Sequence, residues 1–171
     1  KGIVAADEST ATIAKRLESI NSPSTGDDRR DYRAMLFGAT AAMKANISGV
    51  ILFDEPLRQK ARNGTPLVDM IKSTGAVPGI KLDTGAKPLA LSPGETVTEG
   101  LDGLAARVEE YAKLGAEFAK WRAVIDIGKG IPTHNAIHAN AHALARYAAI
   151  CQAGGIVPMV EPEVLMDGDH D

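Results

Sequence analysis

The sequence has little cysteine, few aromatic residues and no long apolar segment. Its single cysteine, Cys151, excludes a disulfide within the chain and suits a reducing cytosol. Aromatic residues make up only 4% of the chain, so aliphatic side chains must fill the interior. No apolar run could span a bilayer, and the N-terminus lacks the basic-then-apolar plan of a signal peptide. We therefore expect a cytoplasmic protein without a membrane partner.

An excess of positive charge is also missing. The formal net charge is −3, which argues against a nucleic-acid partner. The 171 residues, 44% of them hydrophobic, suffice for one domain over residues 1–171. The chain starts at Lys1 with a strand-like run close behind and ends in a polar stretch over residues 166–171. We therefore expect it to be a segment of a longer protein.

Short apolar runs alternate with segments of helical period. The runs predict strands at Ile3–Ala6, Gly49–Phe53, Ala76–Ile80, Glu117–Trp121 and Ile156–Val160. Helices are expected at Thr10–Ser19, Asp28–Ala45, Pro66–Ser73, Glu99–Leu114 and Thr133–Ala153, and a loop at Gly85–Val97. This alternation is typical of βαβ units and a parallel sheet, which makes the fold class α/β.

Two parallel architectures compete, an open doubly wound sheet and a closed (β/α)₈ TIM barrel. The doubly wound sheet would place a glycine-rich phosphate turn after the first strand, but residues 7–11 read Asp-Glu-Ser-Thr-Ala. This turn favours the barrel. Since a barrel needs about 250 residues, the chain would hold about the first five βα units.

Charged residues follow four of the expected strands. They are Asp7, Lys81, Lys120, Arg122, Glu161 and Glu163. In a parallel barrel the C-terminal ends of the strands meet at the face where active sites form. A balanced set of structural ion pairs would give the same signs. Four strands ending in this way favour a site, although the pattern does not define a reaction.

The first expected helix presents polar side chains close to its N-terminus. Ser9, Thr12 and Arg16 share one face by their spacing, and Lys15 lies beside them. Hydroxyls, free N–H groups and cations suit a phosphate. An N-cap followed by a solvated basic turn fits these residues equally well.

Two further clusters are best explained by solvent exposure. Residues 28–31, Asp-Arg-Arg-Asp, read most simply as an ion-paired helix surface. Three histidines have a spacing that can bind a metal, His134, His138 and His142. They flank an apolar stripe, which we assign to Ile137, Ala141, Leu144 and Ala148. Since no carboxylate or cysteine completes a ligand set, we expect a surface flank and no metal.

Several runs occur together in a familiar order. They cover residues 2–10, 49–53, 79–83, 100–104, 118–122 and 154–163, the last reading Gly-Gly-Ile-Val-Pro-Met-Val-Glu-Pro-Glu. Collinear over essentially the whole chain, they resemble class I fructose-bisphosphate aldolases. The resemblance implies a (β/α)₈ barrel, a homotetramer and reversible cleavage of fructose 1,6-bisphosphate in glycolysis or gluconeogenesis. The products would be glyceraldehyde 3-phosphate and dihydroxyacetone phosphate, formed through a lysine Schiff base without a metal or other cofactor.

The resemblance also implies residue roles. Glu161 would be the acid–base residue, Lys120 would stabilise charge beside the scissile bond, and Asp7 would assist proton transfer at the C4 hydroxyl. Glu163 would pair with the lysine cluster. The phosphates would be held by Ser9, Thr12, Lys15, Arg16, Lys81 and Arg122, with Arg29 contributing from further out. Thr12 stands where many relatives have serine, which preserves the hydroxyl.

The Schiff-base lysine itself is not among these positions. The resemblance places it in a Glu-Gly-x-x-Leu-Lys-Pro run that would follow Asp171, and Lys81 and Lys120 do not match it. We therefore expect the 171 residues alone to be inactive. Three alternatives are a Schiff-base barrel for another sugar phosphate, a non-catalytic chain binding phosphates or proteins, and a metal-dependent aldolase.

Overall fold

The computed structural model describes residues 1–170 and divides the chain into two compact units. Unit 1 comprises Lys1–Lys81 and Lys113–Phe118, and unit 2 comprises Leu82–Ala112 and the chain from Ala119 onward. A single domain over residues 1–171 stays a prediction. No helix among residues 1–170 combines the length and the apolar character needed to cross a membrane.

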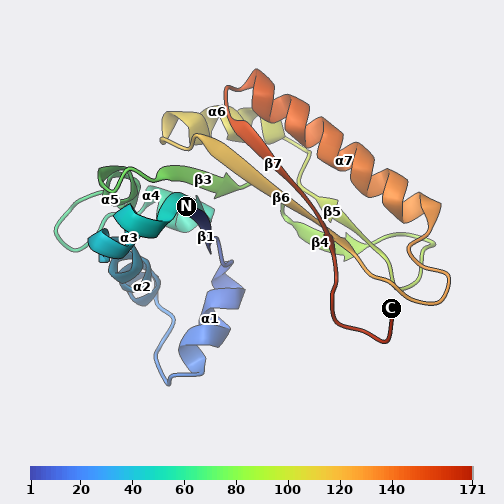
Figure 1. The fold of residues 1–171 in the computed structure, drawn as a ribbon, viewed down its shortest axis with the longest axis horizontal. Coiled ribbons are helices and arrows are strands. Elements are labelled where there is room, and N and C mark those ends of the chain that lie inside the picture. The colour runs from blue at the N-terminus through green and yellow to red at the C-terminus, as the bar shows by residue number, and fades with distance from the viewer. Residues whose placement is uncertain (171) are drawn as a thin grey trace. The chain divides into compact units, whose positions relative to one another are not determined.

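Three parallel strands form the sheet of unit 1, and Figure 1 labels the first and the last of them. They are β1 (Gly2–Ala6), β2 (Ile47–Leu52) and β3 (Val77–Lys81), in the order β1-β2-β3. The register pairs Ala6 with Leu52 and Leu52 with Ile80, so the three C-terminal ends are level. The helices of this unit are α1 (Thr10–Glu18), α2 (Gly26–Gly38), α3 (Thr40–Asn46), α4 (Asp54–Arg58) and α5 (Leu67–Ser73).

The segment that we expected to form one helix forms two, α2 and α3. The segment predicted as a continuous helix over residues 28–45 breaks at Ala39, whose ψ of 59° leaves the helical region. The Ala39 N–H donates to the carbonyl of Leu36, the tightened bond of a closing turn. The prediction of one helix was wrong because the apolar period continues across a backbone break. The short helix α4 was not predicted at all.

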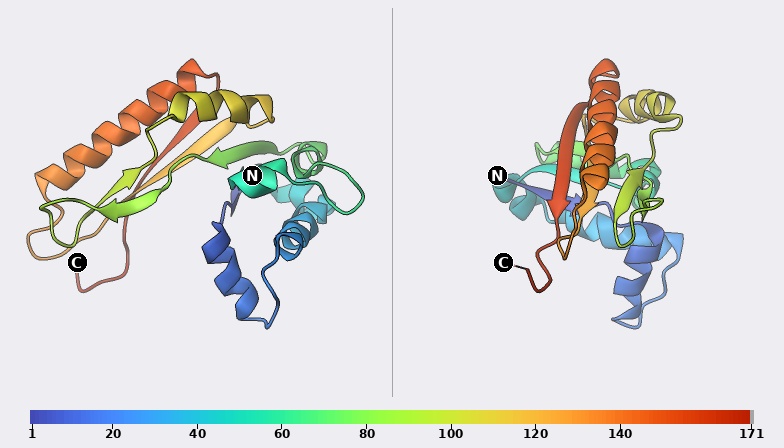
Figure 2. Two further views of the ribbon diagram at one scale, coloured as in Figure 1. Left: turned by 180° about the vertical axis from the view of Figure 1, so that it is seen from behind. Right: turned by 90° about the vertical axis from the view of Figure 1, so that its right-hand side faces the viewer.

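Unit 2 contains two longer strands, a hairpin and two helices. Its elements are β4 (Gly85–Pro88), β5 (Thr96–Glu99), α6 (Leu104–Lys113), β6 (Phe118–Ile125), α7 (His134–Ala153) and β7 (Val157–Val164), although the last residue of α6 and the first of β6 belong to unit 1. Strands β6 and β7 are hydrogen-bonded neighbours, and β4 pairs with β5 in an antiparallel hairpin. Figure 2 shows α7 alongside β7, against which it packs.

The hairpin corrects the expected loop at Gly85–Val97. Asn140 of α7 explains why β5 is ordered there, since its amide donates to the Thr96 carbonyl at 2.8 Å and accepts from the Thr98 N–H at 3.2 Å. Helix α6 accordingly starts five residues later than predicted, after Gly103 in a positive-φ conformation (66°).

Strands β6 and β7 run four residues beyond their predicted ends. We expected the charged residues to terminate these strands, but Lys120, Arg122, Glu161 and Glu163 lie inside them. Side chains alternate across a strand, and Trp121 of β6 is fully buried and packs on Tyr147 of α7, with ring centroids 5.3 Å apart. The charged face continues because its charges pair across the two strands.

The buried face of α7 also differs from the predicted stripe. Of the four predicted residues only Leu144 is buried, and Ile137 is 46% exposed. The buried face consists of Ala136, Asn140, Ala143, Leu144, Tyr147 and Cys151. The prediction failed because a polar residue, Asn140, occupies the centre of that face.

Candidate active site

The level strand ends of unit 1 carry two of the predicted catalytic-type residues. Asp7 follows β1 directly, and Lys81 is the last residue of β3. Both side chains are half-buried. Because β1 and β3 flank β2 in register, Asp7 and Lys81 stand at one edge of this sheet. Unit 1 thus places an acid and a cation at the face where barrel enzymes carry their chemistry.

The start of α1 confirms Ser9 as its N-cap. Its hydroxyl accepts from the Thr12 N–H at 3.3 Å and lies 3.0 Å from the Thr12 hydroxyl. Thr12, Lys15 and Arg16 are exposed on this helix. The Arg16 guanidinium donates to the Glu8 carboxylate. Two hydroxyls and a helix N-terminus therefore adjoin cations here, an arrangement that suits a phosphate.

Arg29 has a protein partner in the structure. Its guanidinium forms two parallel hydrogen bonds to Glu55 of α4, at 2.8 and 2.6 Å, and a third to the Ser24 carbonyl at 2.5 Å. The hydrogen bond from Arg29 is the main cause that holds the pKa of Glu55 below its ordinary value, and burial opposes it. A phosphate at this point would have to compete with a bidentate carboxylate.

Arg33 of α2 was not singled out in the sequence. It is fully buried, and donates to the carbonyls of Ala6 and Glu8, at 3.4 and 2.8 Å. Two carboxylates face it, those of Glu8 at 3.6 Å and of Glu55 at 3.8 Å. Burial lowers the pKa of the guanidinium, and the two carboxylates oppose that shift.

Two ion pairs connect β6 to β7 in unit 2. Lys120 Nζ lies 3.4 Å from Glu161 Oε1, and Arg122 donates to Glu163 two residues further along each strand. The equal steps indicate parallel strands in register. The hydrogen bond from Arg122 holds the pKa of Glu163 below its ordinary value and raises the pKa of Arg122. We expected Glu163 to pair with lysines, but its hydrogen-bonded partner is Arg122.

Asp83, two residues beyond β3, bonds to the backbone of β6. It is buried, and its carboxylate accepts from the Gly85 N–H at 3.0 Å and the Arg122 N–H at 3.3 Å. Glu8, Arg33 and Glu55 of unit 1 and Asp83 of unit 2 were not predicted as functional residues. Glu8 and Asp83 could have been predicted, because each lies two residues after the end of a strand. Arg33 and Glu55 lie within helices, and no sequence pattern around them indicates a function.

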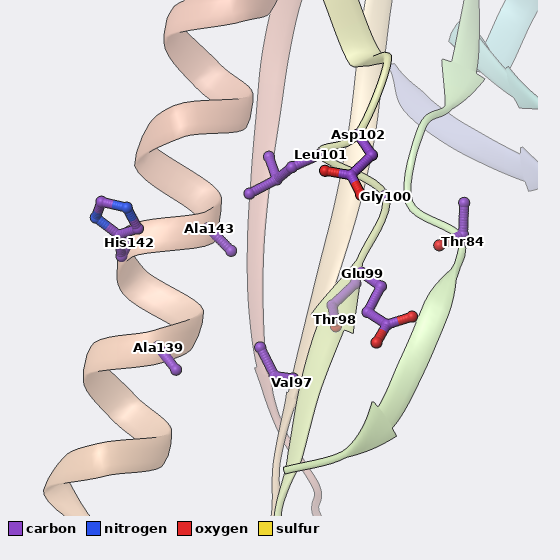
Figure 3. A pocket seen from close by; sticks show the side chains of 10 residues that line it. All are labelled: Thr84, Val97, Thr98, Glu99, Gly100, Leu101, Asp102, Ala139, His142 and Ala143. Carbon is purple, nitrogen blue, oxygen red and sulfur yellow. The ribbon is translucent and has the colours of Figure 1, made fainter. Parts of the chain in front are cut away.

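The histidines of α7 lie on an exposed face, as predicted. Their rings stack, with centroids 6.0 Å apart for His134 and His138 and 6.5 Å apart for His138 and His142. Among residues 1–170 no group of three metal-ligating side chains surrounds a common point. Figure 3 shows a pocket between α7 and β5, in which the His142 ring projects away from Glu99 and Asp102.

A family model described as fructose-bisphosphate aldolase class-I matches residues 1–171. A "Probable fructose-bisphosphate aldolase class 1" of Xanthomonas campestris is 61% identical over all 171 residues. The chain belongs to the class I fructose-bisphosphate aldolase family. The cytosolic "Fructose-bisphosphate aldolase 6" of Arabidopsis thaliana is 57% identical over the same length. The chain covers 51% and 48% of these two relatives, so it spans about half their length.

A solved aldolase structure has the same fold. The fructose-bisphosphate aldolase of Plasmodium falciparum, in complex with TRAP and a small-molecule inhibitor, matches with a TM-score of 0.96 and 50% identity. The match covers 99% of this chain and 49% of that one. The fold is therefore part of a (β/α)₈ barrel, as the strand–helix alternation and the turn at residues 7–11 predicted.

Proposed function

We propose that the full-length protein containing this chain cleaves fructose 1,6-bisphosphate reversibly into glyceraldehyde 3-phosphate and dihydroxyacetone phosphate. The observation that carries the proposal is the pairing of Lys120 with Glu161 on neighbouring strands of an aldolase-family fold. A carboxyl group beside an ammonium in a partly desolvated site can exchange protons during Schiff-base chemistry. The side chains are 12% and 30% exposed, so water screens the pair only in part.

In this proposal, Glu161 gives and takes the protons of carbinolamine dehydration. Lys120 stabilises negative charge beside the scissile bond, and Asp7 assists proton transfer at the C4 hydroxyl. Ser9, Thr12, Lys15 and Arg16 hold one phosphate through the start of α1, and Lys81 and Arg122 contribute cationic charge. Arg29 contributes from further out, and Glu163 sets the position of Arg122.

The nucleophilic lysine would come from residues outside these 171, in a Glu-Gly-x-x-Leu-Lys-Pro run. It follows that the 171-residue chain alone has no cleavage activity. We further propose that the full-length protein is a cytoplasmic homotetramer acting in glycolysis or gluconeogenesis. Its chemistry would need no metal, since the Schiff base itself withdraws the electrons.

The test is reductive trapping on the full-length protein and on the 171-residue chain. Each is incubated with dihydroxyacetone phosphate and sodium borohydride, and its mass is measured. The proposal is supported if an adduct forms on the full-length protein and not on the 171-residue chain. The full-length protein should also cleave fructose 1,6-bisphosphate in the presence of EDTA. Loss of cleavage in EDTA would indicate a metal-dependent enzyme. Faster cleavage of another sugar phosphate would indicate a Schiff-base enzyme with a different substrate. Phosphate binding without any adduct would indicate a non-catalytic phosphate-binding protein.

A further inference from the structure

Arg33 holds the backbone on both sides of Asp7. Its Nε and Nη2 atoms donate to the carbonyls of Ala6 and Glu8, the two neighbours of Asp7 in the chain. The guanidinium has no exposed surface and comes from the middle of α2, a helix that begins with a capping box at Thr25. A rigid planar fork on a helix fixes these carbonyls more closely than solvent could. The direction of the Asp7 side chain is therefore set in part by Arg33.

The same guanidinium is the centre of a series of alternating charges. Glu8 lies between Arg33 and Arg16, and Glu55 lies between Arg33 and Arg29. Glu8 Oε2 and Arg33 Nη1 are buried without a hydrogen-bond partner within residues 1–170. Their interaction with the opposite charges is thus Coulombic, and desolvation strengthens it.

The two partners of Glu8 differ in exposure. The Arg16 side chain is 59% exposed, the Glu8 side chain is 7% exposed, and Arg33 is fully buried. Arg16 can leave Glu8 to contact a phosphate only if the buried carboxylate keeps a counter-charge, because an uncompensated buried charge is strongly unfavourable. Arg33 supplies that charge and cannot itself reach solvent.

We propose that Arg33 is a positioning residue that orients Asp7 and allows Arg16 to exchange from Glu8 to a substrate phosphate. This inference rests on the proposed aldolase function. The planar fork of the guanidinium orients Asp7, and its positive charge allows Arg16 to leave Glu8. The two effects can be separated, because lysine keeps the charge and loses the fork.

The experiment compares variants of the full-length protein in cleavage of fructose 1,6-bisphosphate. Arg33→Met lowers kcat about tenfold or more, because Asp7 is misplaced, and raises KM about tenfold, because Glu8 retains Arg16. Arg33→Lys lowers kcat similarly but leaves KM within about threefold. Adding Glu8→Gln to Arg33→Met restores KM and not kcat, since the competing carboxylate is gone. Arg30→Met is the control, an arginine on the same helix that bonds to Asp27 and Asp31.

A purely structural role predicts a different pattern. The double variant would then be worse than Arg33→Met in KM, and Arg33→Lys would lose both parameters together. Either result overturns the proposal. If Arg33→Met does not fold, Glu8→Gln alone decides the charge effect, since it should tighten phosphate binding and a weakening would refute it.

Binding of inorganic phosphate, measured by calorimetry on the same variants, separates this inference from the proposed function. If phosphate affinity follows the charges of Glu8 and Arg33 but no sugar bisphosphate is cleaved, the aldolase proposal fails and the exchange of Arg16 stands. If cleavage is normal and phosphate affinity is the same in the Glu8 and Arg33 variants as in the unsubstituted protein, the proposed exchange of Arg16 is wrong and the aldolase proposal stands.

Discussion

Lys120 of β6 and Glu161 of β7 face each other across two neighbouring strands, with 3.4 Å between Nζ and Oε1. One register step along, Arg122 and Glu163 repeat the arrangement. Of the two carboxylates, Glu163 is committed to a hydrogen bond from Arg122 that lowers its pKa. Glu161 pairs with its cation at a longer distance, and we propose that it is the carboxylate that carries the acid–base role.

The first prediction follows from this difference. In the full-length protein, Glu161→Gln should lower kcat for fructose 1,6-bisphosphate about 10²-fold or more, because an amide cannot transfer the protons. KM should stay within about threefold, because no phosphate contact is lost. Steady-state kinetics measures both. Glu163→Gln provides the matched control, and an equal loss of kcat in that variant would contradict the assignment.

A second prediction concerns the charge at Arg122. Arg122→Met should leave Glu163 without its hydrogen-bonded cation and return the pKa of Glu163 toward its ordinary value of 4.5. In the unsubstituted protein, the lowered pKa of Glu163 stabilises the folded state above pH 4.5. This stabilisation is lost as the pH falls through the lowered pKa. The stability of the variant should therefore depend less on pH below about 5. Urea unfolding between pH 3 and 7 tests this, and an unchanged pH slope would contradict it.

The third prediction concerns Gly79 of β3. A Cβ at this position would lie 2.3 Å from the ring of Phe118, with two more ring atoms at 2.5 Å. Gly79→Ala must therefore displace a buried ring and should destabilise the protein by about 1–3 kcal/mol. Gly2→Ala in β1 is the control, since a Cβ there meets no atom within 4 Å. Chemical denaturation compares them, and equal stabilities would show that Phe118 moves without cost.

The strand–helix order, the α1 cap and the position of Asp7 were predictable because each depends on neighbouring residues. Ser9 caps the helix that it precedes, and Asp7 follows an apolar run. The partners of Arg33 were not predictable, since Glu55 is 22 positions away and only the tertiary fold brings the two side chains together. The predicted lengths of β6 and β7 were too short for a related reason. Charged residues usually end a strand, but here each finds its counter-ion on the neighbouring strand.

The fourth prediction concerns Asn140, the polar residue at the centre of the buried face of α7. Its amide bonds to the backbone of Thr96 and Thr98 in β5. Asn140→Ala should cost about 2–3 kcal/mol, because it leaves a buried N–H and a carbonyl without partners. Asn135→Ala on the same helix should cost less than about 0.5 kcal/mol, because Asn135 is exposed and bonds to a single hydroxyl. Thermal unfolding measures the difference, and similar losses would mean that Asn140 does not anchor β5.

The last prediction concerns Cys151 of α7, which is fully buried near Tyr147. Burial raises the pKa of its thiol from 9.0 to about 11. The reactive thiolate at pH 8 is then about a hundredfold rarer than for a thiol of ordinary pKa, and burial restricts access further. A disulfide reagent should therefore label Cys151 only slowly at pH 8, and at the normal rate in urea. The raised pKa stabilises the fold below pH 9, and this contribution is lost as pH rises toward 11. Cys151→Ala should remove this loss of stability at high pH. Rapid labelling of the folded protein at pH 8 would contradict the prediction and show that α7 opens readily.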